Sequence, residues 1–264
     1  MNTVDILGVP VAAVNLPDAA DRIETWIREE PRRYVTVTGV HGIMESVYDP
    51  EVRRAHRRAG MCVPDGMPTV WIGLLAGHRG MGRVYGPDLM LELMARSAGA
   101  GHRHFFFGGK EGVAERLRDR MVARFPELNV VGTYSPPFRP MTLEEEAGLE
   151  AELERLAPDI LWVGLSTPKQ ERWMAAQVGR INAKVLIGVG AAFDIHAGLL
   201  RQAPRWMRRS GLEWFFRLCV EPRRLWRRYL VNNPLFILLM LGQWAGFRIG
   251  GAPRDDEERM GHAG

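Results

Sequence analysis

Asp65 is the carboxylate whose place in the sequence best suits chemistry. It lies in a Pro64-Asp65-Gly66 turn, directly after the short apolar run 61–63. An aspartate there either stabilises the turn by accepting hydrogen bonds from nearby backbone N–H groups, or serves as a general base at the end of a strand. Asp194, which follows the glycine-containing run 188–193, leaves the same two alternatives open.

Glycine-rich turns follow several other apolar runs. Glycine allows close approach to the backbone, and N–H groups exposed at the start of a helix bind phosphate. The candidate ligand-binding residues in these turns are Thr38, Gly108, Gly109, Lys110, Gly164, Pro168, Gly188 and Gly190. Together the turns favour a nucleotide or another phosphorylated ligand, although a plain turn is an equal alternative for Gly108-Gly109-Lys110.

Motifs for cofactors and metals are incomplete or absent. The run Gly188-x-Gly190-x-x-Phe193 lacks the third glycine of the dinucleotide fingerprint, and no GxxxxGK[ST] loop occurs. There is no Asp-x-Asp pair and no spaced His or Cys cluster. We therefore expect no metal and no cofactor. His41 and His196 stand alone in the sequence, and a structural role is the alternative to ligand binding for both.

Short β-rich runs alternate with helical patterns over the first 200 residues. The expected strands are 34–38, 61–63, 104–107, 129–132, 159–165 and 184–189. Helices are expected between them, including one that begins at Gly86-Pro87-Asp88 with proline in its first turn. This alternation predicts an α/β fold with a mostly parallel sheet flanked by helices. Ligands bind at the carboxyl ends of such strands, so the turns named above are expected to meet at one edge.

Positive charge is concentrated in one segment. The 264 residues carry a formal net charge of +4, yet residues 201–230 alone contain nine Arg and two Glu. Such a block is typical of segments that bind phosphates, nucleic acid or an anionic membrane. Arg217, Arg224, Arg227 and Arg228 are the candidates for contact with a diphosphate or a membrane surface. Solvated or ion-paired arginines on a packed helix are the alternative.

The sequence divides into an α/β body at 1–200, a helical appendage at 201–250 and a tail at 251–264 that we expect to be disordered. A composition of 46% hydrophobic and 25% charged residues is typical of globular proteins and excludes collagen-like or coiled-coil chains.

Two cysteines exclude a disulfide framework and favour a reducing cytosol. No secretory signal is visible, and the apolar run 235–247 is shorter than the ~20 residues that span a bilayer. We expect a cytoplasmic protein, soluble or attached peripherally to the membrane.

A set of short motifs occurs in a specific order. The motifs are Pro64-Asp65-Gly66, Arg83-Val84-Tyr85-Gly86-Pro87-Asp88, Phe106-Phe107-Gly108-Gly109-Lys110, Ser166-Thr167-Pro168-Lys169-Gln170-Glu171, Gly188-Val189-Gly190-Ala191-Ala192-Phe193-Asp194, Arg201-Gln202-Ala203-Pro204 and Gly211-Leu212-Glu213-Trp214. In this combination the sequence resembles the WecG/TagA/CpsF family of bacterial glycosyltransferases, over about residues 5–245. The resemblance implies a Rossmann-like body with a C-terminal helical appendage.

The resemblance also implies an activity. Members of this family transfer a sugar from a UDP-sugar to a lipid-linked acceptor, with inversion and without a metal ion. The implied donor sugars are N-acetylmannosamine, its uronic acid or a glucose-type sugar. The implied acceptor is a sugar on undecaprenyl diphosphate at the cytoplasmic membrane surface, where cell-surface polysaccharides are built. A homo-oligomer is compatible with this interpretation, and no nucleic-acid partner is expected.

Four residues take roles from the resemblance. It implies that Asp65 is the catalytic base and that Thr36 lies in the active-site pocket. Arg83 corresponds to a partner of the donor diphosphate, and Gln170 to another donor-site residue. Thr38 stands where the family usually has Asn, so contacts with the donor sugar are expected to differ.

Two other functions fit parts of the sequence. An NAD-dependent oxidoreductase fits the α/β body, but the glycine fingerprint is incomplete and no acidic partner for the ribose is evident. A nucleic-acid-binding module fits the Arg-rich segment, but no nucleic-acid motif accompanies it. Binding of UDP, NAD or DNA distinguishes the three.

Overall fold

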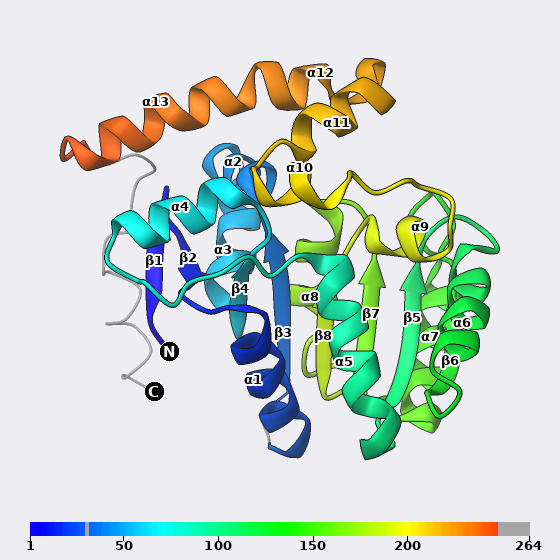
Figure 1. Cartoon of the computed structure of the whole chain (residues 1–264). Helices are drawn as coiled ribbons and strands as arrows, with labels where there is room; N and C mark the ends of the chain where they lie inside the picture. The colour runs from blue at the N-terminus through cyan, green and yellow to red at the C-terminus, as the bar shows by residue number, and fades with distance from the viewer. Residues whose placement is uncertain (30–31, 248–264) are drawn as a thin grey trace.

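The computed structural model of the chain describes residues 1–29 and 32–247. Its centre is an eight-stranded sheet in the order β1-β2-β4-β3-β8-β7-β5-β6, in which only the β1–β2 pair is antiparallel (Figure 1). The strands are β1 (Thr3–Ile6), β2 (Val9–Ala12), β3 (Arg33–Thr38), β4 (Met61–Pro64), β5 (Arg103–Gly108), β6 (Asn129–Tyr134), β7 (Ile160–Gly164) and β8 (Val185–Gly188). The predicted α/β fold is confirmed. The predicted disordered tail at 251–264 lies outside the described residues.

Helices connect the parallel strands and cover both faces of the sheet (Figure 1). The helices of the body are α1 (Leu16–Arg28), α2 (Val40–Tyr48), α3 (Pro50–Arg58), α4 (Met67–Leu75), α5 (Gly86–Ala100), α6 (Val113–Arg124), α7 (Leu143–Leu156), α8 (Lys169–Gln177) and α9 (Ala192–His196). Local sequence sets several of their starts. The side chain of Asn15 accepts the N–H of Asp18 and the side chain of Asp18 accepts the N–H of Asn15, which is a capping box at α1.

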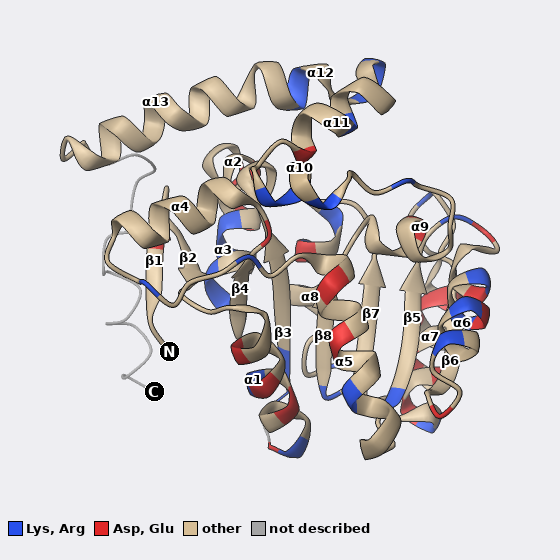
Figure 2. Cartoon of the chain, viewed as in Figure 1, with Lys and Arg blue, Asp and Glu red and all other residues tan. Residues whose placement is uncertain are grey.

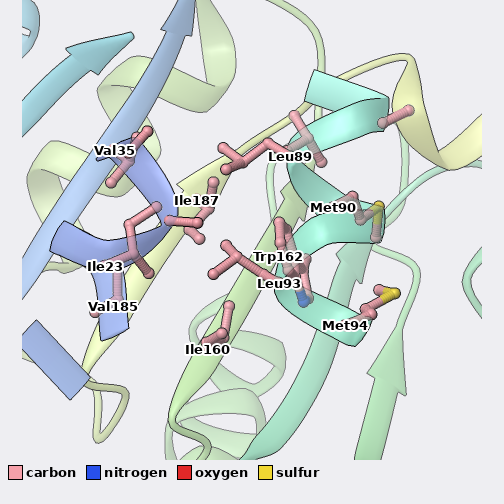
Figure 3. Packing of buried hydrophobic residues seen from close by; sticks show 14 of the residues in the cluster. Ile23, Val35, Leu89, Met90, Leu93, Met94, Ile160, Trp162, Val185 and Ile187 are labelled. Carbon is pink, nitrogen blue, oxygen red and sulfur yellow. The ribbon is translucent and has the colours of Figure 1, made fainter. Parts of the chain in front are cut away.

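Successive residues of the central strands pack into two separate hydrophobic clusters, one on each face of the sheet. Val35 and Phe106 belong to the cluster that includes buried residues of α1, α5 and α6. Figure 3 shows Val35 in this cluster with Ile23 of α1 and Leu93 of α5. The neighbouring strand residues Tyr34 and Phe105 face the opposite side, where α7 and α8 pack. Side chains alternate between the faces of a strand, so a continuous apolar run is required where both faces are covered. This is why the central strands were recognisable in the sequence.

The hairpin formed by β1 and β2 was not predicted. Its two strands are four residues each, and β2 joins the sheet by pairing with β4. Val9 and Val11 are fully buried in a third cluster together with Ile43 of α2. Two short apolar runs at a chain end give little periodicity, so the hairpin depends on the elements that cover it.

Four helices follow the body: α10 (Arg205–Arg209), α11 (Glu213–Val220), α12 (Pro222–Leu230) and α13 (Asn232–Trp244). We call these helices the appendage. They lie across the carboxyl-end edge of the sheet, and α13 reaches back over β1 and β2 (Figure 1). Phe236 and Met240 of α13 are buried there, and the Gln243 side chain accepts the Leu7 N–H at 2.9 Å. Within the described ranges, no helix has the length and apolar character needed to cross a membrane.

Candidate active site

Asp65 lies at the carboxyl end of β4, between the ends of two other elements. Its N–H donates to the carbonyl of Thr38 at 3.1 Å, which ties the turn to β3. Its Oδ1 accepts the N–H of Gly86, the first residue of α5, at 3.4 Å. Burial raises the pKa of the Asp65 carboxyl, and the positive charge of Arg83 opposes this effect. The side chain therefore has the place and the raised pKa of a general base.

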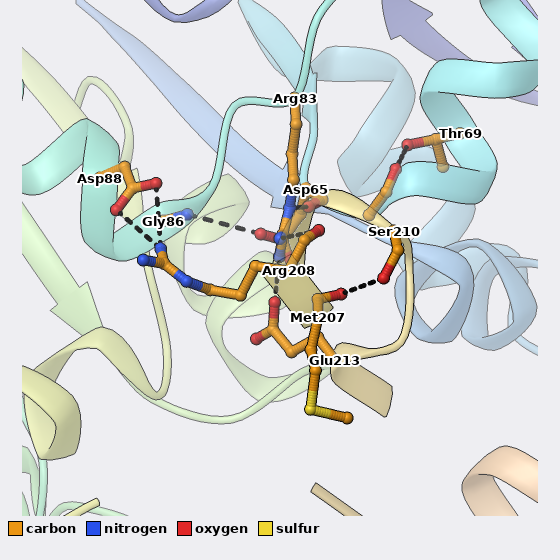
Figure 4. Close-up of polar contacts among 10 residues, drawn as sticks. Asp65, Thr69, Arg83, Gly86, Asp88, Met207, Arg208, Ser210 and Glu213 are labelled. Carbon is orange, nitrogen blue, oxygen red and sulfur yellow. Dashed lines mark hydrogen bonds and ion pairs between the residues drawn. The ribbon is translucent and has the colours of Figure 1, made fainter. Parts of the chain in front are cut away.

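Arg83 joins the Asp65 turn to the appendage (Figure 4). Its Nε donates to the backbone carbonyl of Asp65. Its Nη2 lies 2.5 Å from Oε2 of Glu213 in α11. Arg208 of α10 makes a second link, because its Nη1 lies 3.4 Å from the carboxylate of Asp88 in α5. Arg83 thus lies beside the candidate base, with its guanidinium paired to the Glu213 carboxylate; its expected contact with the donor diphosphate stays a prediction.

Thr36 and Thr38 lie on one face of β3, in a buried hydrogen-bonded chain. Their hydroxyl oxygens are 3.0 Å apart, and Nε2 of His56 lies 3.1 Å from the Thr38 hydroxyl. Nδ1 of His56 faces the carbonyl of Val52 at 3.0 Å. Because that carbonyl can only accept, Nδ1 carries the proton, and the single proton of the Thr38 hydroxyl is shared between two neighbouring acceptors, Thr36 and Nε2 of His56. Thr36 is fully buried, so the structure places it beneath the site rather than on its open surface.

Gln170 is buried at the start of α8, next to a second buried carboxylate. Its Nε2 donates to Oε1 of Glu171 at 3.0 Å, and the hydroxyl of Thr167 donates to the same oxygen at 2.9 Å. Oε1 of Gln170 has no hydrogen-bond partner among the described residues. It lies 3.5 Å from where a Cβ at Gly190 would be, so it faces the end of β8. The amide oxygen is therefore a buried acceptor without a hydrogen-bond partner among the described residues at this edge.

Close packing explains why three of the predicted ligand-binding positions are glycine. A Cβ on Gly108 would lie 2.6 Å from the backbone of Gly164, in the neighbouring strand. A Cβ on Gly164 would lie 2.4 Å from the ring of Phe193, and one on Gly188 would lie 2.6 Å from Met174. The absence of a side chain at these positions thus lets strand ends and α9 approach one another.

Lys110, Pro168 and Asp194 lie at the same edge of the sheet. Lys110 is exposed after β5, and Pro168 is the N-cap of α8. Burial raises the pKa of the Asp194 carboxyl, while the charges of Lys110 and Arg224 act in the opposite direction. The turns after β5, β7 and β8 are therefore brought together as the sequence predicted.

The four candidate arginines of the appendage divide into two pairs. Arg217 and Arg228 are half-buried, and the Nε of each is buried without a hydrogen-bond partner in the described part of the chain. Arg228 is close enough to Asp65 and His41 for its charge to act on both. Arg224 and Arg227 are exposed, and Arg224 pairs with Glu221 at 2.5 Å. Figure 2 shows basic segments of the appendage above the strand ends.

A cavity of about 600 Å³ lies between α2 and the appendage. It is lined by His41, Glu45, Arg224, Leu225, Trp226, Arg227, Arg228, Val231 and Asn232. Burial, followed by the charge of Arg228, lowers the pKa of His41 to about 3. His41 is therefore neutral at physiological pH, and the positive charge of this cavity comes from its arginines. Asp65 does not line the cavity, but Arg228 lines it and is also close enough to interact with the charge of Asp65.

Sequence reasoning missed four residues that the fold brings to this region: His41 as a wall of the cavity, His56, Glu171 and Glu213. In the sequence, Glu213 was named only as part of the Gly211-Leu212-Glu213-Trp214 motif, and no role was assigned to it.

Across residues 1–29 and 32–247, no group of three or more His, Cys, Asp or Glu side chains is arranged to hold a metal ion.

Comparison with known proteins identifies the family of the chain. Residues 4–249 match the family described as glycosyl transferase WecG/TagA/CpsF. The chain is 26% identical over 242 residues to the N-acetylglucosaminyldiphosphoundecaprenol N-acetyl-beta-D-mannosaminyltransferase of Bacillus subtilis (strain 168), covering 91% of this chain and 92% of that protein. It is 24% identical over 238 residues to the protein of the same name from Staphylococcus aureus (strain MRSA252), covering 89% and 90%. The chain belongs to the WecG/TagA/CpsF family of glycosyl transferases.

Proposed function

We propose that this protein transfers a sugar from a UDP-sugar to a sugar carried on a lipid diphosphate, in the synthesis of a cell-surface polysaccharide. The observation that carries the proposal is the position of Asp65, a carboxyl of raised pKa at the strand-end edge, within reach of the charges of Arg217 and Arg228. The names of the relatives make N-acetylmannosamine the first donor sugar to test. Its uronic acid and glucose-type sugars are the alternatives.

Asp65 acts as the general base in this reaction. It removes the proton from the acceptor hydroxyl, and that oxygen forms a bond to the anomeric carbon on the face opposite the diphosphate. The bond between the anomeric carbon and UDP breaks, its electron pair leaves with UDP, and the configuration inverts. A raised pKa brings the carboxylate closer to the pH at which it must accept a proton. General-base catalysis of this kind contributes about 10²–10⁴-fold.

Arginines of the appendage stabilise the diphosphates in this proposal. Arg217 and Arg228 each retain a buried Nε without a hydrogen-bond partner in the described chain. A guanidinium presents planar donors that match phosphate oxygens. The cavity beside Arg228 also contains the apolar side chains of Leu225, Trp226 and Val231. This combination suits an acceptor that joins a diphosphate to a lipid.

The appendage also attaches the protein to the inner membrane surface in this proposal. Its exposed apolar residues include Trp226, Leu230, Ile237, Leu238, Leu241 and Trp244. Arg223, Arg224 and Arg227 are exposed on α12, together with Trp226 and Leu230. Basic, amphipathic helices bind anionic lipid surfaces, and each basic residue near the surface contributes about 1 kcal/mol. The protein would thereby meet its lipid-linked acceptor without crossing the bilayer.

Release of UDP tests the proposed function. The full-length protein is incubated with a panel of UDP-sugars and a short-chain N-acetylglucosaminyl diphosphate lipid, and UDP is measured. We expect release that depends on both substrates, with N-acetylmannosamine as the first candidate donor. The variant Asp65→Asn keeps the size of the side chain and removes the base, so release should fall by at least about 100-fold. A folded Asp65→Asn protein with the wild-type rate would exclude Asp65 as the base.

Membrane attachment is tested separately. The full-length protein should sediment at low salt with vesicles containing an anionic lipid and should remain in solution with vesicles of neutral lipid only. Failure to bind anionic vesicles would exclude peripheral attachment. It would leave the transfer reaction to be decided by UDP release.

A further inference from the structure

Glu213 places a second carboxylate near Asp65. It is the first residue of α11, and its Oε2 lies 2.5 Å from Nη2 of Arg83. The side chains of Arg83 and Glu213 are only 16% and 15% exposed. Ion pairs that are fully exposed contribute little because water and salt screen them. Partial burial makes this pair more sensitive to the loss of one partner.

All three nitrogens of the Arg83 guanidinium contact the protein (Figure 4). Nε donates to the backbone carbonyl of Asp65, and Nη1 donates to the carbonyl of Arg208 at 3.3 Å. Nη2 pairs with Glu213, and the guanidinium lies over the ring of Tyr85 at 4.1 Å. One side chain thus contacts the Asp65 turn, α10 and α11. Its position depends on the appendage as much as on the body.

We propose that Glu213 is a positioning residue for the transfer reaction: through Arg83 it fixes the appendage to the turn that carries Asp65. This inference rests on the proposed function. Glu213 and Arg217 lie in α11, one helical turn apart. Holding Glu213 against Arg83 therefore also holds Arg217 beside Asp65, and α12 with Arg228 follows directly in the chain. Without the pair, α13 would still pack on the β1–β2 hairpin, and the Arg208–Asp88 ion pair would remain between α10 and α5, but α11 would lose its ion pair with Arg83 beside Asp65.

The charges that face Asp65 give this role a measurable signature. After burial, the Arg83 charge is the strongest influence on the Asp65 pKa, and it lowers the pKa. Glu213 raises the pKa, and Arg217 lowers it. Arg228 and the phenol of Tyr85 also interact with the Asp65 charge. Removing the negative charge of Glu213 leaves these cations in excess, so the pKa of Asp65 should fall.

The variant Glu213→Gln tests the inference in the full-length protein. With UDP-N-acetylmannosamine and the short-chain lipid acceptor, kcat/KM should fall by about tenfold, the effect of losing one charge-assisted hydrogen bond. The acid limb of its pH profile should move to lower pH. Hydrogen exchange of the backbone amides in 205–220 should become faster, because α10 and α11 are held less firmly.

Glu221→Gln is the matched control. It removes another carboxylate of the appendage, whose pair with Arg224 is within α12 and its N-cap. It should leave both the acid limb and hydrogen exchange in 205–220 as in the wild type. A structural effect common to any loss of charge would change both variants alike, which would contradict a specific role of Glu213.

Binding of UDP alone separates this role from the expected diphosphate contact of Arg83. If Arg83 binds the diphosphate directly and Glu213 merely competes for it, Glu213→Gln should bind UDP more tightly and lose no activity. That result, or unchanged exchange in 205–220, would overturn the inference. If the wild type releases no UDP from any donor, the proposed function fails. Hydrogen exchange in 205–220 of the Glu213→Gln variant then still decides whether Glu213 holds the appendage against the body.

Discussion

Oδ1 of Asp65 lies 3.4 Å from the backbone nitrogen of Gly86, the first residue of helix α5. The N-terminus of a helix carries partial positive charge and stabilises a carboxylate. Burial nevertheless has the larger effect, so the pKa of Asp65 is raised above its ordinary value of 3.8. The Gly86 N–H thus fixes the Asp65 carboxyl in place, while burial increases its affinity for a proton.

The pH profile of the reaction should therefore show this raised pKa. Asp65 must be ionised to accept a proton, so kcat/KM should fall as the pH falls through the pKa of Asp65. The acid limb should lie above 3.8, the pKa of an ordinary aspartate. The measurement is UDP release between about pH 4 and pH 8. His41, with a pKa of about 3, should not contribute a step in this range. A limb that His41→Gln removes would contradict the assignment to Asp65.

Arg228 and Arg227 are neighbours in sequence but should differ in effect. Arg228→Gln should lower kcat/KM by about 10- to 100-fold, because charge-assisted hydrogen bonds to phosphate contribute about 1.5–3 kcal/mol. Arg227 is exposed. Arg227→Gln should mainly weaken binding to anionic vesicles, by about fivefold for the loss of one surface charge. The measurements are UDP release in the absence of vesicles and vesicle sedimentation. Equal effects of the two variants on UDP release would show that the different positions of Arg227 and Arg228 on α12 do not determine their roles in the reaction.

The buried chain of Thr38 and His56 should matter for stability. Thr38→Val removes the hydroxyl that Nε2 of His56 contacts at 3.1 Å, and leaves that nitrogen buried without a partner. The expected loss is about 1–3 kcal/mol in the free energy of unfolding. Thr38→Ser keeps the hydroxyl and should lose less. Chemical denaturation of both variants measures the difference, and equal midpoints would show that the hydrogen bond contributes nothing.

Two glycine substitutions should have opposite effects. A Cβ on Gly164 would lie 2.4 Å from the ring of Phe193, so Gly164→Ala should destabilise the fold by about 1–3 kcal/mol through overpacking. Gly148, inside α7, has open space around its Cβ position. Gly148→Ala should stabilise the protein by about 0.5–1 kcal/mol, because alanine is favoured in a helix. Thermal or chemical denaturation checks both, and a tolerated alanine at Gly164 would contradict the packing explanation.

The fold was predictable wherever local pattern and burial agreed. Five of the six parallel strands after residue 30 are mostly apolar and buried, and a glycine lies within a few residues of the end of each; the sixth, the edge strand β6, was located by its short β-rich run alone. Asp65 was found for the same reason, since its turn follows such a strand. The β1–β2 hairpin was missed because its two four-residue strands have too few residues to show a period.

The contacts that organise the site lie far apart in the sequence. Arg83 and Glu213 are 130 positions apart, and His56 reaches Thr38 from a different helix. No spacing rule connects such residues, because their proximity depends on how helices dock on the sheet. For the same reason the contact of Glu213 with Arg83 could not be inferred from its neighbours in the chain.

The sequence by itself determined the alternation of strands and helices after residue 30, the turn that holds Asp65 and the basic character of the segment 201–230. These features depend on residues that are close together in the sequence, so local pattern and composition are enough to predict them. Only the tertiary structure decided that Arg217 and Arg228 are half-buried near Asp65 while Arg224 and Arg227 are exposed. Helical periodicity defines the faces of α11 and α12, but the packing of the appendage on the body selects which face meets the site.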